Sequence, residues 1–294
     1  MSLKEIIDFG NEITLFGNTG IQMMDFSFSI EGGKSISKSF IEESNTNQEQ
    51  DRTEIILKEL AKDEYGELIN IETGQKIVSQ NTYNVQFSSA LDVFEGSWLP
   101  APIHKRQGII SNQKTNYEKG PTLWSRFMVV KLNEPDQLGN NYRLIIAFDT
   151  KVLEERADNR PYTNIELRDI QSESNFDFIS NVKDISWFIY QEWVKSWLED
   201  TYTTCRKEKG LRAPRLQNES TARSAFWAFY LILIDGIVKK CNLPSIKLIN
   251  TLTSPRTNPP IGVNIVLDIG NNRTCGVLIE EGHETYLDLT ESNS

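Results

Sequence analysis

The opening of the chain alternates hydrophobic and polar residues, a pattern typical of strands with one buried face. Strands are expected over residues 12–16, 21–30 and 35–41, separated by glycine-containing turns. Within the second of these, Phe26 and Phe28 alternate with serines. Three short strands joined by tight turns predict a β-meander with one hydrophobic face.

The pattern weakens in the next segment. Residues 42–52 contain no large apolar side chain, which predicts a mobile loop. A short helix is expected over residues 54–62 and a hairpin over residues 68–79. Alternation returns at residues 83–87, where another strand is expected.

A second sheet hairpin is expected in the middle of the chain. Its strands are residues 126–132 and 142–148, and the loop between them is rich in Asn, Pro, Asp and Gly. Asp149 follows the second strand, where a carboxylate either ends a strand or serves a metal or substrate. The strand-ending role is the favoured interpretation.

Two helices are expected after the hairpins, the first amphipathic and the second buried. Ile185, Ile189, Trp193 and Trp197 recur at intervals of four, which predicts one helix from Asn181 to about residue 210. A second helix is expected over residues 219–241. Its apolar run is much shorter than the roughly 20 residues of a membrane span. The two helices are therefore interpreted as a core pair packed on the sheets.

Composition narrows the class of protein. The chain has 294 residues, 38% of them hydrophobic, and a formal net charge of −10. These values indicate a globular protein. The negative charge argues against nucleic-acid binding and against attachment to an anionic membrane surface. The N-terminus shows no signal-peptide pattern, so a cytoplasmic location is expected.

Familiar catalytic and metal-binding motifs are absent from the sequence. The three cysteines are far apart and only two histidines occur, so a zinc site is not expected. There is no Walker A loop, Rossmann fingerprint or nucleophile elbow. Other chemistry must carry any activity.

A rigid loop around Trp98 is one candidate for binding a partner. Residues 94–102 contain two prolines and a glycine, which disfavour regular structure. An aromatic side chain on such a loop either anchors a protein partner or fills the core beneath the loop. Filling the core is the favoured interpretation.

The strongest candidate site is a predicted hairpin near the end of the chain. Val263–Leu267 and Cys275–Ile279 are apolar runs that flank a polar turn. Backbone N–H groups of such a turn can hold a phosphate, and a carboxylate beside it can hold Mg²⁺ through water. The candidate residues are Asp268 for catalysis and magnesium, and Gly270, Asn271, Asn272, Arg273 and Thr274 for phosphate.

This hairpin resembles the first phosphate hairpin of the superfamily of actin, sugar kinases and heat-shock chaperone ATPases. The string from Asp268 to Thr274 is especially similar to the opening hairpin of type III pantothenate kinases. The resemblance implies a nucleotide site for ATP and Mg²⁺. Asn271 and Asn272 depart from the small or hydroxylated residues of the chaperones, which weakens the case for a γ-phosphate contact from these side chains.

Several segments together resemble the N-terminal part of SrfB-type virulence factors, which are large bacterial proteins. The segments are residues 13–22, 96–102, 120–122, 147–150 and 266–276. The resemblance implies a leading domain followed by an actin-like ATPase domain. It also implies that this chain ends within the ATPase domain.

The sequence therefore predicts an α+β protein, with antiparallel sheets and a packed helix pair followed by the opening hairpin of an actin-like ATPase fold. The expected division is a family-specific domain over residues 1–255 and the first part of an ATPase-like domain over residues 256–294. The parent protein is expected to be a nucleotide-dependent switch or ATPase. The chain alone is expected to be inactive and to hold no cofactor. The alternative is a non-catalytic interaction module for effector assembly or delivery.

Overall fold

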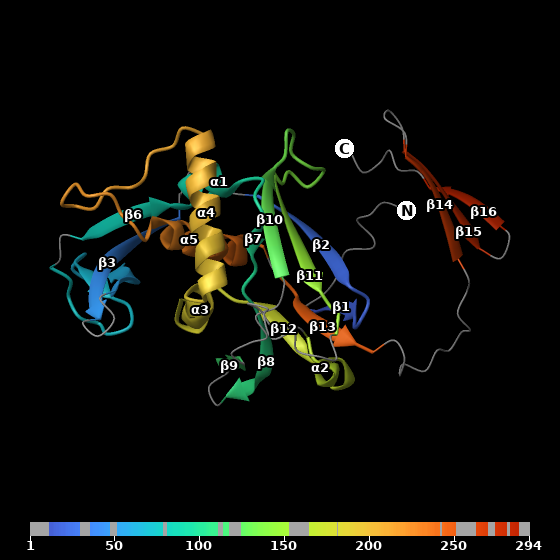
Figure 1. Cartoon of the computed structure of the whole chain (residues 1–294), viewed down its shortest axis with the longest axis horizontal. Coiled ribbons are helices and arrows are strands. Elements are labelled where there is room, and N and C mark those ends of the chain that lie inside the picture. Colours follow the sequence, from blue (N-terminus) through green and yellow to red (C-terminus); the bar gives the residue numbers. More distant parts are fainter. Residues whose placement is uncertain are drawn as a thin grey trace. The chain divides into compact units, whose positions relative to one another are not determined.

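The computed structural model describes residues 12–29, 36–47, 52–78, 81–110, 114–117, 125–152, 165–180, 182–241, 243–250, 263–269, 274–280 and 283–287. The chain divides into two compact units, Met1–Asn250 and Thr251–Ser294. Figure 1 shows the elements of both units.

The first unit is α+β with mainly antiparallel sheets, as the sequence predicted. Its first sheet has the order β1-β13-β12-β8-β9, with β1 Glu12–Phe16, β13 Ser245–Ile249, β12 Asn175–Phe178, β8 Ile103–Ile110 and β9 Lys114–Tyr117. The second has the order β2-β11-β10-β7, with β2 Ile21–Phe28, β11 Tyr142–Asp149, β10 Ser125–Lys131 and β7 Leu99–Pro100. The third has the order β5-β4-β3-β6, with β5 Leu68–Asn70, β4 Arg52–Lys62, β3 Ser37–Asn47 and β6 Thr82–Gln86.

The predicted opening meander is wrong, although its strands exist. β1, β2 and β3 belong to three different sheets. β1 pairs in parallel with β13 from the far end of the unit, and β2 pairs with β11. Alternation along a strand reports which face is buried, but it carries no information about the partner strand.

The predicted loop at residues 42–52 is wrong at residues 42–47 and 52, which lie in strands, while residues 48–51 lie outside the described residues. The predicted helix at 54–62 is also wrong. β3 and β4 form one long antiparallel ladder from Ser39–Leu60 to Asn47–Arg52. The polar residues of β3 after Ile41 pair with β4 alone, because β6 pairs only with Ser37–Ile41. In β4 the buried residues are Leu57 and Leu60. Tertiary pairing thus overrides a local pattern that favoured a helix.

The predicted hairpin of residues 126–132 and 142–148 is confirmed as the pair β10 and β11. Asp149 ends β11, and its side chain accepts a hydrogen bond from the Lys151 backbone N–H (3.0 Å). This contact is the strand-ending role that was favoured.

The helices are α1 Phe87–Phe94, α2 Leu167–Gln171, α3 Val182–Ile189, α4 Glu192–Glu208 and α5 Ala225–Lys240. The single helix predicted from residue 181 to 210 is in fact α3 and α4, separated at Tyr190 and Gln191. The break lets the indole N–H of Trp227 donate to the Ile189 carbonyl (3.1 Å). α1 was not predicted, because strand-like alternation continued into Phe87.

Helix α5 is the centre of the hydrophobic core. All side chains from Ala225 to Ile237 are buried (Gly236 has none), because the apolar run covers all sides of the helix. The Tyr230 hydroxyl donates to the Pro100 carbonyl (2.6 Å), and Asp235 lies 3.4 Å from the Lys38 ammonium. α5 therefore contacts the second sheet through β7 and the third sheet through β3. It also packs against α4, where the rings of Tyr202 and Phe229 lie 5.2 Å apart.

The second unit is a three-stranded antiparallel sheet of β14 Val263–Ile269, β15 Thr274–Glu280 and β16 His283–Leu287, in that order. β14 and β15 pair as a hairpin, as expected. β16, which adds to β15, was not predicted from the sequence.

Candidate functional site

The β14–β15 hairpin carries the residues that the sequence singled out. Its register pairs Asp268 with Cys275 and Ile269 with Thr274, so Asp268 lies on the next-to-last pair before the turn. Asp268 and Thr274 thus flank the turn on opposite strands. Gly270, Asn271, Asn272 and Arg273 lie outside the described residues, and their role in phosphate binding stays a prediction.

The Trp98 loop is held by hydrogen bonds to its backbone. The Trp197 indole N–H donates to the Trp98 carbonyl (3.0 Å), and the following residues Leu99 and Pro100 form the short strand β7. Leu99 is fully buried, whereas Trp98 is half-buried. The loop is thus anchored on α4, and an anchoring role of the Trp98 ring for a partner stays a prediction.

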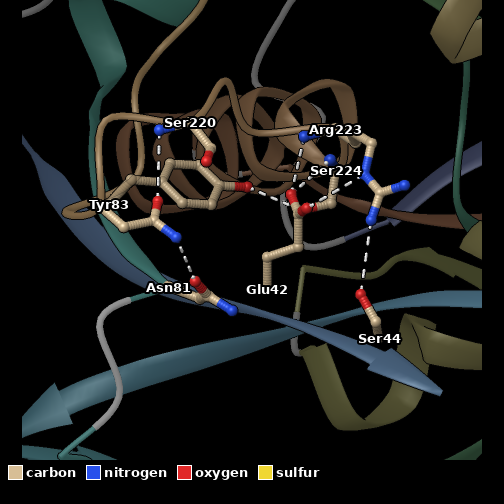
Figure 2. Close-up of polar contacts among 8 residues, drawn as sticks. Glu42, Ser44, Asn81, Tyr83, Ser220, Arg223 and Ser224 are labelled. Carbon is tan, nitrogen blue, oxygen red and sulfur yellow. Dashed lines mark hydrogen bonds and ion pairs between the residues drawn. The ribbon is translucent and has the colours of Figure 1, made fainter.

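The best-defined polar site among the described residues joins β3 to the start of α5 (Figure 2). Glu42 projects from β3 and is only 5% exposed. Its Oε2 accepts three hydrogen bonds, from the backbone N–H of Arg223 (2.7 Å), the backbone N–H of Ser224 (2.9 Å) and the Ser224 hydroxyl (2.9 Å). The Arg223 guanidinium lies 3.7 Å from Oε1.

This carboxylate performs the task of a helix cap. Ser224 occupies the N-cap position of α5, but its side chain makes no capping hydrogen bond within the helix. Glu42 instead accepts from the N–H groups of the N-cap Ser224 and of Arg223 just before it, where the helix dipole also favours a negative charge. Because both carboxylate oxygens have partners, the arrangement fits an anchor between sheet and helix better than a general base.

Tyr83 completes this polar site from β6. Its hydroxyl lies 3.0 Å from the Ser224 hydroxyl. Because the Ser224 hydroxyl donates to Glu42, Tyr83 is the donor to Ser224. Burial raises the pKa of Tyr83 far above its usual value, the hydrogen bond to Ser224 opposes the shift, and Glu42 adds to it. The tyrosine therefore remains protonated as a fixed donor.

A cleft of about 630 Å³ opens beside this site. Aromatic side chains line it, namely Tyr190, Phe226 and Trp227. Ile55 and Ile56 of β4 contribute an aliphatic wall. The volume falls in the range of small-molecule and peptide sites.

Charged side chains surround the cleft. The acidic ones are Glu54, Glu192 and Glu199, and the basic ones are Lys195 and Arg223. Lys195 lies over the Trp227 ring, with its ammonium nitrogen 5.8 Å from the ring centroid. An aromatic lining with charged groups at the mouth can bind an amphipathic ligand.

His104 is a separate buried polar group in β8. It is 1% exposed, and neither ring nitrogen has a hydrogen-bond partner among the described residues. Its ring lies against Trp187 (4.9 Å between centroids) and Phe188 (6.0 Å). Burial lowers the pKa of His104 from 6.5 to about 4, so the neutral ring acts as a core side chain.

Among the described residues, no three histidine, cysteine or carboxylate side chains form a group that could hold a metal. Within the same part of the chain, no helix has the length and hydropathy needed to cross a membrane.

Sequence reasoning missed the residues of the Glu42 site. Glu42 was assigned to a loop, and Ser224 was placed inside a helix that was expected to start at residue 219. One signal was available: a serine directly before the apolar run of residues 225–234 is typical of an N-cap. No local signal could identify Glu42, because its partners lie about 180 residues away in sequence.

Comparison with known proteins gives one match. The family model described as Virulence factor SrfB matches residues 2–294. No curated protein and no solved structure matches the chain. Since the family model covers the whole chain apart from Met1, the chain belongs to the SrfB virulence factor family.

Proposed function

We propose that the chain works within a longer SrfB protein as part of a nucleotide-dependent switch, and that the β14–β15 hairpin supplies its phosphate-binding turn. The observation that carries the proposal is the string from Asp268 to Thr274, which joins the two paired strands. Asp268 lies near the end of β14, and Thr274 begins β15.

The chemistry of these side chains fits magnesium and phosphate. Asp268 would hold Mg²⁺ through water, and Arg273, Thr274 and the backbone of Gly270–Thr274 would contact phosphate oxygens. ATP with Mg²⁺ would supply the phosphoryl group whose presence or loss changes the state of the switch. The hairpin would form one wall of that site.

The test compares two carboxylate-to-amide variants in the full-length protein. Asp268→Asn should reduce ATP turnover by about 100-fold, because a contact to charge in the transition state contributes that much. Glu280→Gln is the matched control, since Glu280 lies at the opposite end of the same hairpin, paired with Val263. Unchanged turnover in Asp268→Asn refutes the assignment.

A second experiment measures nucleotide binding by the isolated chain of residues 1–294. Titration calorimetry with Mg-ATP should give no micromolar affinity, because one hairpin provides few of the contacts that a nucleotide needs. Micromolar binding by this chain contradicts the assignment of a single wall to it.

The half-buried Trp98 favours a second candidate, a non-catalytic interaction module. Its backbone carbonyl is held by Trp197, so Trp98→Ala removes the ring without removing that hydrogen bond. A protein partner that the wild-type chain retains and the variant loses supports the module, whereas equal retention argues against a role for this ring.

A further inference from the structure

The cleft beside α5 combines an aromatic floor with an open strand edge. β4 pairs with β5 only at Leu60, Ala61 and Lys62. The remainder of that edge, from Arg52 to Glu59, lacks a neighbouring strand among the described residues. Ile55 of this edge lines the cleft.

The direction of the free backbone groups follows from the register. The Tyr190 hydroxyl both accepts from the Leu57 N–H (3.3 Å) and donates to the Leu57 carbonyl (3.3 Å), so Leu57 points its backbone away from β3. Backbone groups of alternate residues in a strand point the same way. The N–H and C=O of Ile55 therefore face outward, and no described residue bonds them.

Tyr190 lies at one end of the open edge of β4 and also lines the cleft. Its hydroxyl forms a hydrogen bond with the Leu57 backbone, while 40% of the residue is exposed. The Trp227 indole N–H donates a hydrogen bond to the Ile189 carbonyl. Phe226 and Trp227 are only 4% and 3% exposed, so the ring that the floor offers to a ligand is that of Tyr190.

The rim of the cleft is acidic. Glu54, Glu192 and Glu199 form no ion pair with a described residue, and all three are exposed. Arg223 is already paired with Glu42, at 3.7 Å. Of the described basic side chains that line the cleft, Lys195 is thus the one without an acidic partner, and it lies over the Trp227 ring as a ligand cation would.

We propose that this cleft binds an extended basic segment of a partner protein. The segment would pair with β4 at Ile55, adding a strand to the sheet, and place a lysine or arginine side chain between the acidic rim and the aromatic floor. Charge complementarity selects this occupant, because an acidic segment would face Glu54, Glu192 and Glu199. The proposal does not depend on the β14–β15 hairpin, and its test involves no nucleotide.

The first experiment uses a fluorescein-labelled peptide of alternating threonine and lysine, with the threonine–glutamate peptide as control. Fluorescence anisotropy at low ionic strength should show saturable binding of the basic peptide alone. Affinity should fall as salt is added, because exposed charges are screened. Equal binding of both peptides, or no saturable binding of the basic one, overturns the proposal.

Variants of the rim locate the binding. Glu54→Gln with Glu199→Gln should weaken the basic peptide about fivefold, as expected for two exposed charge contacts. Lys195→Gln should instead strengthen it by about threefold, since a cation that repels the basic peptide is removed from the cleft. Glu64→Gln, in the exposed turn after β4, is the matched control and should leave binding unchanged. An effect of the control equal to that of the rim variants refutes the site.

Strand pairing is tested on the peptide, which avoids any effect on folding of the protein. N-methylation of alternate residues removes the N–H groups that would bond β4 while keeping every side-chain charge. The methylated peptide should bind about fivefold more weakly, because the N–H that would donate to the Ile55 carbonyl is lost. Undiminished binding shows that the peptide does not add to the strand, and overturns that part of the proposal.

Discussion

Glu42, which lies in β3 of the third sheet, caps the start of helix α5. Most helices satisfy their first N–H groups with a side chain of the N-cap residue itself. Here the Ser224 hydroxyl donates to Glu42, and Glu42 accepts from the helix start. A buried carboxylate with three donors is stable only while all three remain in place.

Replacing Glu42 should therefore destabilise the first unit. Glu42→Ala leaves two buried N–H groups and one hydroxyl without an acceptor, which should lower the free energy of unfolding by about 3 kcal/mol. Glu42→Gln keeps one carbonyl oxygen and should cost about 1 kcal/mol. Urea unfolding monitored by circular dichroism measures both changes.

The adjacent Glu43 offers a matched control. Its carboxylate is 39% exposed and pairs with Lys58 on the surface. Glu43→Gln should change stability by less than about 0.5 kcal/mol. If Glu42→Ala is no more damaging than Glu43→Gln, the capping role is wrong.

His104 should make stability depend on pH. Its pKa is about 4 in the folded chain, against 6.5 for an unperturbed histidine. Below pH 6.5 the unfolded chain binds a proton that the folded chain excludes. The free energy of unfolding therefore decreases as the pH is lowered from about 6.5 to about 4. The full effect is on the order of 3 kcal/mol.

The variant His104→Phe isolates this contribution. A phenyl ring suits the surrounding Trp187 and Phe188, and no hydrogen bond of the His104 ring is lost. The difference in stability between variant and wild type should grow in favour of the variant as pH falls from 7 to about 4. A constant difference over that range contradicts the buried neutral histidine.

At the scale of elements, the contact between α1 and α5 depends on a glycine. A Cβ at Gly236 would lie 2.1 Å from a ring atom of Phe87, which is buried. Helix propensity alone would make Gly236→Ala stabilising by about 1 kcal/mol. The clash should make the net effect of Gly236→Ala destabilising, because a buried ring can move only by disturbing its neighbours.

Gly236→Ala should accordingly destabilise the protein by about 1–2 kcal/mol in urea unfolding. Combined with Phe87→Leu, the same change should cost less than in the wild-type background, since the shorter side chain makes room. Additive effects of the two substitutions would show that the helices do not meet at this position.

Elements were predicted well where their own side chains decide their structure. β10 and β11 are largely apolar strands joined by a loop rich in turn residues, and the core of α5 is a long apolar run, so both were found. β3 and β4 were not, because their ladder is specified by partners distant in sequence. The helix break at Tyr190 has the same origin, since the Tyr190 hydroxyl forms a hydrogen bond with the backbone of Leu57 in β4.

At the scale of the whole molecule, the first unit holds the buried core. The hydrophobic cluster extends from Ile13 to Leu248, and β1 pairs with β13 near the two ends of that unit. Pairing between distant segments of one unit closes it as a cooperative structure.

Residues 1–250 should therefore fold without residues 251–294. The shortened chain is expected to keep the circular dichroism of the first unit and a urea midpoint within about 0.3 M of that of the full chain, by a two-state analysis. Aggregation of the shortened chain, or a large loss of stability, would show that the first unit depends on the second.

The sequence by itself determined the α+β class, the β10–β11 and β14–β15 hairpins, the buried apolar helix and the Asp268–Thr274 string. These features depend on residues close together in the chain, whose spacing is visible in one dimension. Only the tertiary structure decided which strands pair, that Glu42 caps α5, and that an aromatic cleft lies beside the open edge of β4. Each of these joins residues far apart in sequence, and burial and hydrogen bonding select such partners only when the chain folds.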